Sequence, residues 1–272
     1  VGSRLVALER RQRLLEQAQI GGVAVGLLAL LLLVLTQLRL SPGTMAEHFG
    51  FVLQGVSTTI YVSLLSIAFA SILALMGALG RLSRNPIANG AAALYVSVVR
   101  GTPLLVQLYL IYLGLPRLRA PLVALGVPAG IAQLLVLPEI PTGIVALSLN
   151  YGAYMTEIFR AGIESIGHGQ WEAAQVIGMS PWQIMQRIIL PQAVRVILPD
   201  VGNQFIAMQK DSSLISVFGV WEITYRANRI AKTDSSYMEM FIVAALLYWI
   251  MTIVSSWGQR WLENRMKHAY ER

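Results

Sequence analysis

The chain has 272 residues, of which 56% are hydrophobic and only 13% are charged. A soluble domain averages about 45 to 50% apolar and about 25% charged residues, so this composition is typical of a membrane protein and excludes a disordered chain. The absence of cysteine excludes a disulfide-stapled secreted module and a cysteine-ligated zinc or iron–sulfur site. A net charge of +7 would suggest nucleic acid binding in a soluble protein, but in a membrane protein it indicates basic cytoplasmic loops, so we expect membrane lipid and no nucleic acid as a partner.

Uncharged stretches predict the membrane-spanning helices, because a helix needs roughly 20 apolar residues to cross about 30 Å of hydrocarbon. The first stretch, residues 20–38, follows a basic segment, and a cleaved signal peptide is its rival interpretation. No small-residue cleavage site follows, which favours a membrane anchor. Five more predicted spans follow in chain order, at residues 54–80, 87–115, 139–157, 193–220 and 240–257.

Two of these spans are interrupted. The sequence Arg100-Gly101-Thr102-Pro103 should kink the span 87–115. The charged residues Asp200, Lys210 and Asp211 are predicted to break the span 193–220 into two half-helices. Such breaks survive at membrane depth only where protein or water lines them, so this span is not expected to face lipid.

The uncharged stretch 120–138 could be a seventh span, which would reverse every later loop. Cytoplasmic loops carry the excess of Lys and Arg, so their distribution decides between the two topologies. Six spans with a cytoplasmic N-terminus place 13 of these residues inside and 6 outside, whereas seven spans place 9 inside and 10 outside. We therefore predict an all-α membrane protein with six transmembrane helices and both termini cytoplasmic. The prolines and glycines of 120–138 make that stretch an external or re-entrant loop.

This topology leaves one sizeable cytoplasmic loop, at residues 161–192, in which the sequence predicts two short helices. The first covers about 170–177, with Glu172 in its first turn, where a carboxylate favours the positive end of the helix. Gly178 is expected to end it, since glycine accepts the left-handed cap conformation.

The second short helix is predicted to begin with Ser180 as its N-cap and Pro181 at the first helical position, and to stop at Pro191. Its apolar side chains fall on two faces, Ile184 with Ile188 and Trp182 with Met185 and Ile189. This is more apolar surface than exposure to water favours, so we expect a partner to cover it.

The 161–192 loop carries seven residues at fixed spacings, namely Glu172, Ala173, Ala174, Gly178, Ile188, Leu190 and Pro191. The pattern resembles the Glu-Ala-Ala loop of permease subunits of bacterial ATP-binding cassette (ABC) importers. Further segments look like the polar amino-acid uptake subfamily, which includes histidine, glutamine and arginine permeases. They are Arg100-Gly101-Thr102-Pro103-Leu104-Leu105-Val106-Gln107, Asn150-Tyr151-Gly152-Ala153-Tyr154, Glu157-Ile158-Phe159-Arg160 and Lys210-Asp211-Ser212-Ser213-Leu214.

The resemblance implies a type I ABC importer permease fold over residues 51–268, preceded at 1–50 by a cytoplasmic tail and an extra transmembrane helix. It implies a bacterial cytoplasmic membrane, and a 161–192 loop that couples to separate ATPase subunits through the seven matched residues. A second permease subunit, identical or homologous, and an extracytoplasmic solute-binding protein are the other implied partners. The substrate would be a polar amino acid moved by alternating access.

The sequence indicates no enzyme. A phosphate-cradling loop would end in Gly-Lys-Ser/Thr, and none of Lys210, Lys232 and Lys267 follows a glycine. Three scattered histidines give no local metal motif, so we expect no metal or cofactor on this chain. The resemblance implies that ATP and magnesium are bound by the partner ATPase.

Polar residues at membrane depth are costly and therefore mark a candidate substrate pathway. Its predicted members are Arg100, Gln107, Asn150, Tyr151, Glu157, Gln204, Lys210 and Asp211. Structural interpretations stay open beside this one. Arg100 could form a salt bridge to Glu157 or Asp211, Lys210 and Asp211 could neutralise each other, Asn150 and Tyr151 could pack between helices, and Glu157 could pair with Arg160.

Two other function classes are compatible with the composition. A secondary transporter or channel could use Asp200, Lys210 and Asp211 as a relay, but it leaves the Glu-Ala-Ala loop unexplained. A membrane adaptor that only docks a cytoplasmic partner has little reason to keep Lys210 and Asp211 at membrane depth. Glutamine, arginine, histidine, lysine and the acidic amino acids all remain candidate substrates.

Overall fold

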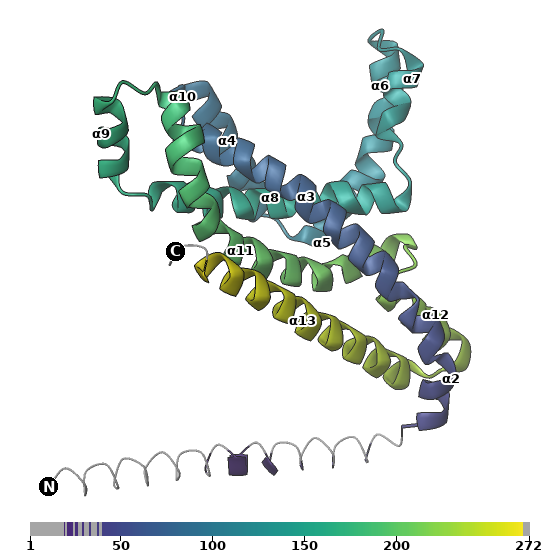
Figure 1. Ribbon diagram of the computed structural model, residues 1–272. Coiled ribbons are helices and arrows are strands. Elements are labelled where there is room, and N and C mark those ends of the chain that lie inside the picture. The colour runs from purple at the N-terminus through teal and green to yellow at the C-terminus, as the bar shows by residue number, and fades with distance from the viewer. Residues whose placement is uncertain are drawn as a thin grey trace, which may run out of the picture. The chain divides into compact units, whose positions relative to one another are not determined.

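The computed structural model describes residues 40–268 without a break, and before them only positions 19, 21–23, 25, 26, 29, 33 and 37. The regular structure of these residues is helical, without a β-strand, as the composition and spans predict (Figure 1). The chain divides into a unit at 1–47 and a unit at 48–272. The predicted first span, 20–38, falls mostly outside the described residues and stays a prediction.

The central helix of the second unit is α3 (Gly55–Leu82), which follows α2 (Pro42–Leu53) closely enough for the two to form one candidate span. Besides Val62, its buried residues are all small, and most of them recur every three or four positions: Gly55, Thr59, Ser63, Ser66, Ala70, Ala74, Gly77 and Ala78. Most of α3 packs along α8 (Glu139–Glu164), and this is the most extensive helix pair among the described residues. A Cβ at Gly77 would collide with the side chain of Thr156, so small residues allow the two backbones to approach closely.

The predicted kink after Arg100 is a sharp bend. Helix α4 (Pro86–Arg100) begins at Asn85, whose Oδ1 accepts from the backbone N–H of Ile87 at 2.9 Å. The chain then turns by 106° into α5 (Leu104–Tyr109). Proline at 103 lacks an N–H and cannot continue the helix, which explains the position of the turn.

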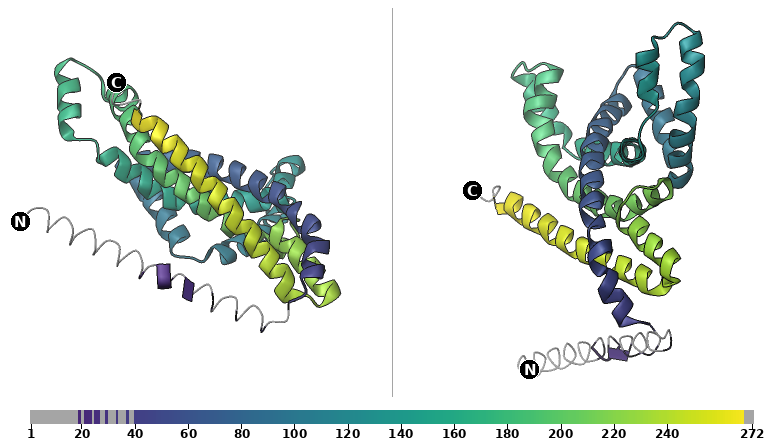
Figure 2. Two further views of the ribbon diagram at one scale, coloured as in Figure 1. Left: turned by 60° about the horizontal axis from the view of Figure 1, so that its bottom comes forward. Right: turned by 90° about the vertical axis from the view of Figure 1, so that its right-hand side faces the viewer.

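The stretch 120–138, predicted to be an external or re-entrant loop, contains short helices. A π-helical turn (Leu110–Gly114) and a 3₁₀ turn (Leu115–Leu118) connect α5 to α6 (Arg119–Ala124). Gly126, with a φ of 90°, then reverses the chain into α7 (Ala129–Ala132) and a 3₁₀ turn (Gln133–Leu135). This hairpin stands away from the other helices of the second unit, and the chain bends by 70° where it enters α8 (Figures 1 and 2).

The predicted break at Asp200 is wrong. Helix α11 (Leu190–Asp211) runs through Asp200 without interruption and also contains Pro199. The Asp200 side chain is exposed and lines a cavity, so its charge can be accommodated without a break in the helix. The predicted change at Asp211 is correct. There the helix tightens into a 3₁₀ segment (Ser212–Phe218) that ends at Gly219, with a φ of 85°.

The remaining helices are α12 (Ile223–Asp234) and the 32-residue α13 (Tyr237–His268), which runs beside α11 (Figure 2). Among the described residues, two segments, Pro42–Leu82 and Tyr237–Met266, are long and apolar enough to cross a membrane, and the two bent pairs raise the number to four. The six-span count remains a prediction.

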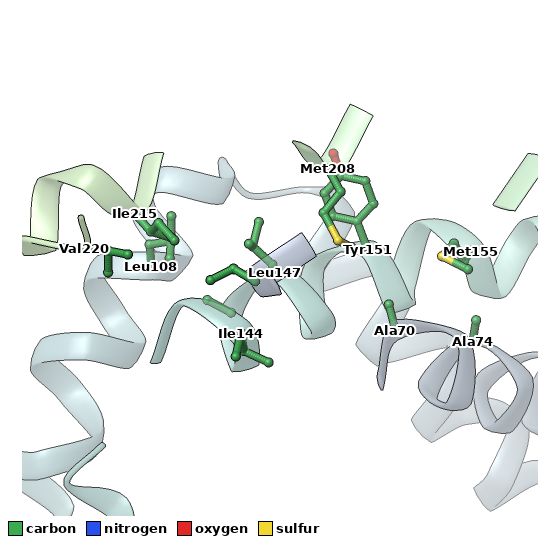
Figure 3. Close-up of a cluster of buried hydrophobic side chains, with 12 residues drawn as sticks. Ala70, Ala74, Leu108, Ile144, Leu147, Tyr151, Met155, Met208, Ile215 and Val220 are labelled. Carbon is green, nitrogen blue, oxygen red and sulfur yellow. The ribbon is translucent and has the colours of Figure 1, made fainter. Parts of the chain in front are cut away.

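The hydrophobic core lies where α3, α5, α8 and α11 meet (Figure 3). Its fully buried side chains include Leu108, Leu147, Met155 and Met208. Lipid tails are as apolar as these side chains, so within a membrane it is their close van der Waals packing that holds together the helices carrying the polar residues discussed below.

Candidate functional site

A cavity of about 500 Å³ lies between α4, α8 and α11. Its polar lining consists of Arg100, Tyr154, Glu157, Asp200 and Gln204. Helical spacing brings them together: Tyr154 and Glu157 lie three residues apart on α8, and Asp200 and Gln204 four residues apart on α11. The cavity therefore presents both signs of charge to one volume, which suits a zwitterion.

Arg100 is the last residue of α4 and holds its guanidinium over the Tyr154 ring, 5.3 Å from the ring centroid. It forms no ion pair with Glu157 or Asp211 in the described part of the chain, so the salt bridges considered from the sequence are absent. A cation–π contact leaves the N–H donors of the guanidinium available in the plane of the group. Arg100 is thus oriented by Tyr154 and can receive an anion.

Glu157 belongs to an ion-pair network at the edge of the cavity. Arg160 Nη2 lies 2.9 Å from Glu157 Oε2, which confirms the predicted local pair, and Arg160 also binds Glu164 at 2.6 Å. Arg81 of α3 approaches Glu157 Oε1 at 3.4 Å, an ion pair without a hydrogen bond. Because two guanidinium groups engage Glu157, Asp200 is the less committed carboxylate of the cavity.

Gln107 and Asn150 brace the bend after α4. Gln107 Nε2 donates to the carbonyl oxygens of Val99 at 2.7 Å and Thr102 at 3.0 Å, and its Oε1 accepts from Asn150 Nδ2 at 3.0 Å. Asn150 is 5% exposed. These contacts favour the interhelical packing role for Asn150 and fix the backbone that carries Arg100.

Tyr151 and Asp211 join α8 to the end of α11. The Tyr151 hydroxyl donates to Asp211 Oδ2 at 2.7 Å, whereas Lys210 is exposed and forms no ion pair within the described residues. Adjacent helical residues point about 100° apart, so Lys210 and Asp211 do not neutralise each other as one interpretation proposed.

Two cavity residues, Tyr154 and Asp200, were not predicted as substrate candidates, and Arg81 was not predicted as a partner of Glu157. Helical spacing was the available signal for the first two. Tyr154 lies three residues before Glu157, and Asp200 lies four residues before Gln204, so each shares a helix face with a predicted member. The Arg81–Glu157 contact depends on the pairing of α3 with α8, which no local pattern reveals.

The 161–192 loop contains the two predicted helices. Helix α9 (His168–Val176) starts two residues earlier than predicted, so the exposed Glu172 is its fifth residue and does not lie in the first turn. Ala174 is buried and Ala173 is exposed. Gly178 adopts a φ of 80°, which confirms its left-handed turn between the two helices.

The second loop helix begins as predicted but continues further. Ser180 and Gln183 form a reciprocal capping box at the start of α10 (Pro181–Ile184). Pro191 does not stop the helix, because a π-helical turn (Met185–Ile189) connects α10 to α11. The Leu190 N–H bonds to the Met185 carbonyl five residues back, and the next residue is a proline with no N–H to satisfy.

The loop buries one set of apolar side chains and exposes another. Ile184 and Ile189 are fully buried, whereas Val176, Ile177 and Trp182 are 87%, 75% and 68% exposed. The exposed three surround Gly178. We name them the Gly178 apolar surface, and nothing in the described chain covers them.

Comparison with known proteins agrees with this geometry. Residues 66–268 match the family described as binding-protein-dependent transport system inner membrane component. The chain belongs to this family. It is 35% identical over 226 residues to the probable amino-acid permease YxeN of Bacillus subtilis, covering 83% of this chain and 96% of the relative. It is 34% identical to the glutamine permease GlnP of Escherichia coli, covering 79% and 92%.

Solved structures give the same result. A crystal structure of an amino acid ABC transporter with histidines matches with a TM-score of 0.69 and 35% identity, over 81% of this chain and 96% of that one. The methionine transporter MetNI, in an inward-facing form, matches at 16% identity with a TM-score of 0.60, over 79% and 97%, and supports the fold alone. The predicted permease family is confirmed, and a secondary transporter would not account for the family match over residues 66–268.

Proposed function

We propose that this chain is the permease subunit of an ATP-driven importer of polar amino acids in a bacterial inner membrane. The observation that carries the proposal is the family match over residues 66–268, which includes the entire Glu-Ala-Ala loop. Relatives at 33 to 34% identity are named as arginine and glutamine permeases, which supports a polar amino acid as substrate.

The cavity chemistry agrees with such a substrate. An amino acid carries one carboxylate and one ammonium group at neutral pH, and the cavity offers Arg100 to the first and Asp200 to the second. In this proposal Tyr154 orients Arg100, while Gln107 and Asn150 hold the bend on which Arg100 sits. These residues bind and orient the substrate and carry out no covalent step.

Energy would come from a separate ATPase that docks on the 161–192 loop and binds ATP and magnesium. The Gly178 apolar surface would be buried in that contact, and α10 continues without a break into α11. A displacement of the loop would therefore reach Asp200 and Gln204 along one helix. Because α10 and α11 are continuous, a movement of the ATPase would be transmitted along them to the cavity, as alternating access requires.

A second permease subunit, identical or homologous, would complete the pore, and an extracytoplasmic solute-binding protein would deliver the substrate. The extra helix at 1–50 and the core at 51–268 remain the proposed division of the chain.

ATP hydrolysis by the complex in lipid nanodiscs tests the function, with and without the binding protein and a panel of amino acids. Stimulation by one or a few amino acids supports the proposal and names the substrate. Uptake driven by an ion gradient alone, in vesicles of the intact chain without an ATPase, would overturn it.

A further inference from the structure

Helix α12 carries an unusual concentration of positive charge. Arg226, Arg229 and Lys232 lie within its 12 residues, and they are half of the 6 Lys and Arg residues that the six-span topology places outside. External segments of membrane proteins are normally poor in such residues, so this cluster requires a physical reason.

The two carboxylates at the ends of α12, Glu222 and Asp234, do not neutralise its positive charges. Glu222 is fully buried and accepts from the N–H groups of Thr224 and Tyr225 at the start of the helix. Asp234 at its end pairs with His48 at 2.9 Å. Within the described residues, Arg226, Arg229 and Lys232 form no ion pair.

Aromatic rings hold the two arginines in place. The Arg226 guanidinium lies 5.0 Å from the Phe51 ring centroid and donates to Gln54 Oε1 at 2.9 Å. Arg229 lies 4.8 Å from the centroid of Trp221, itself 41% exposed. The Arg226 guanidinium therefore donates to protein oxygens, whereas the N–H donors of the exposed Arg229 and Lys232 side chains are available to a ligand.

Apolar surface adjoins these cations. Helix α12 turns at Ser235, with a φ of 54°, directly into α13, whose first residues Tyr237, Met238 and Phe241 are 47%, 50% and 42% exposed. The opposite side of α12 is occupied, since Ile223, Ala227 and Ala231 are fully buried against the protein. Cations beside exposed aromatic and aliphatic side chains match the chemistry of a lipid headgroup above its acyl chains.

We propose that α12 binds an anionic phospholipid of the outer leaflet, with Arg229 and Lys232 on its phosphodiester and the first turns of α13 against its acyl chains. The proposal rests on the topology of the proposed function. It is supported by the position of α12 at one end of α3, with the 161–192 loop at the other end (Figure 1). An acidic face of the solute-binding protein also suits the positive charge, but it does not require the exposed apolar flank.

The test is the affinity of the detergent-purified full complex for phosphatidylglycerol and for phosphatidylcholine, measured by native mass spectrometry. We expect a preference for phosphatidylglycerol that falls about 25-fold in the double variant R229Q/K232Q, because each of the two cations near an anionic headgroup contributes about a fivefold factor. The matched control is R117Q/R119Q, which removes the same charge from another predicted external segment and should keep the preference.

Two outcomes would overturn the proposal. One is an unchanged lipid preference in R229Q/K232Q, or an equal loss in the control variant. The other is a variant R229Q/K232Q that still prefers phosphatidylglycerol but binds the solute-binding protein more weakly in lipid-free detergent. That result would assign the α12 surface to the solute-binding protein. The lipid titration requires neither ATP nor an amino acid, so failure of the proposed transport function does not affect its result.

Discussion

At the scale of single residues, Arg100 is the side chain whose charge the structure leaves available in the cavity. We expect Arg100→Gln to raise the KM for amino-acid uptake in proteoliposomes by roughly 10- to 100-fold, because a hydrogen bond to a charged group is worth about 1.5 to 3 kcal/mol. Basal ATP hydrolysis should change little, since Arg100 lines the cavity and is not part of the Gly178 apolar surface on which the ATPase is proposed to dock.

Arg100→Lys is the conservative comparison, and it should recover part of the affinity because it keeps the charge without the planar donor pair. A KM that stays at the wild-type value in Arg100→Gln would remove Arg100 from the substrate site.

The Tyr151–Asp211 hydrogen bond, 2.7 Å long, gives a second prediction at this scale. Tyr151→Phe should lower the free energy of unfolding by about 1 to 2 kcal/mol, because it removes a donor to a charged acceptor. The same change in an Asp211→Ala background should cost clearly less, and thermal unfolding of the four proteins measures the difference. Equal costs in both backgrounds would mean that the hydrogen bond contributes nothing to stability.

At the scale of elements, the turn between α9 and α10 depends on Gly178. Its φ of 80° favours glycine, tolerates asparagine and strains a branched side chain. We expect Gly178→Val to lower amino-acid-stimulated ATP hydrolysis severalfold while the protein stays in the membrane, and Gly178→Asn to retain most of it. The ratio of uptake to ATP hydrolysis measures the coupling, and normal coupling in Gly178→Val would contradict a role for this turn.

At this scale, local features of the loop helices could be predicted from the sequence, but the connections between helices could not. Ser180, Pro181 and Gly178 were predicted correctly because caps and left-handed glycines are local properties of a few residues. The continuity of α10 with α11 through Pro191 was not predicted, because the π-helical turn depends on the path of the longer helix. The cavity required the pairing of helices distant in sequence, which brings Arg100, Tyr154 and Asp200 together.

At the scale of the whole molecule, α3 connects α12 to the 161–192 loop. Gly55 at its start packs against Ile223 of α12, and Leu82 at its end packs with the loop residues Ala174 and Ile184. A helix of 28 residues is about 42 Å long, which matches a bilayer with its headgroup regions. The loop and α12 should therefore lie on opposite sides of the membrane.

The absence of native cysteine makes this topology directly measurable. We expect the single variant Thr233→Cys, in α12, to react with a membrane-impermeant maleimide in intact cells, and Gln175→Cys, in α9, to react only in inside-out vesicles. Both positions are exposed, so labelling reports the side of the membrane and not burial. If 120–138 were a seventh span, the pattern would reverse for both positions, because every later loop would change sides. Labelling of both positions from the same side would contradict either topology and with it the function of α3 as the link between loop and α12.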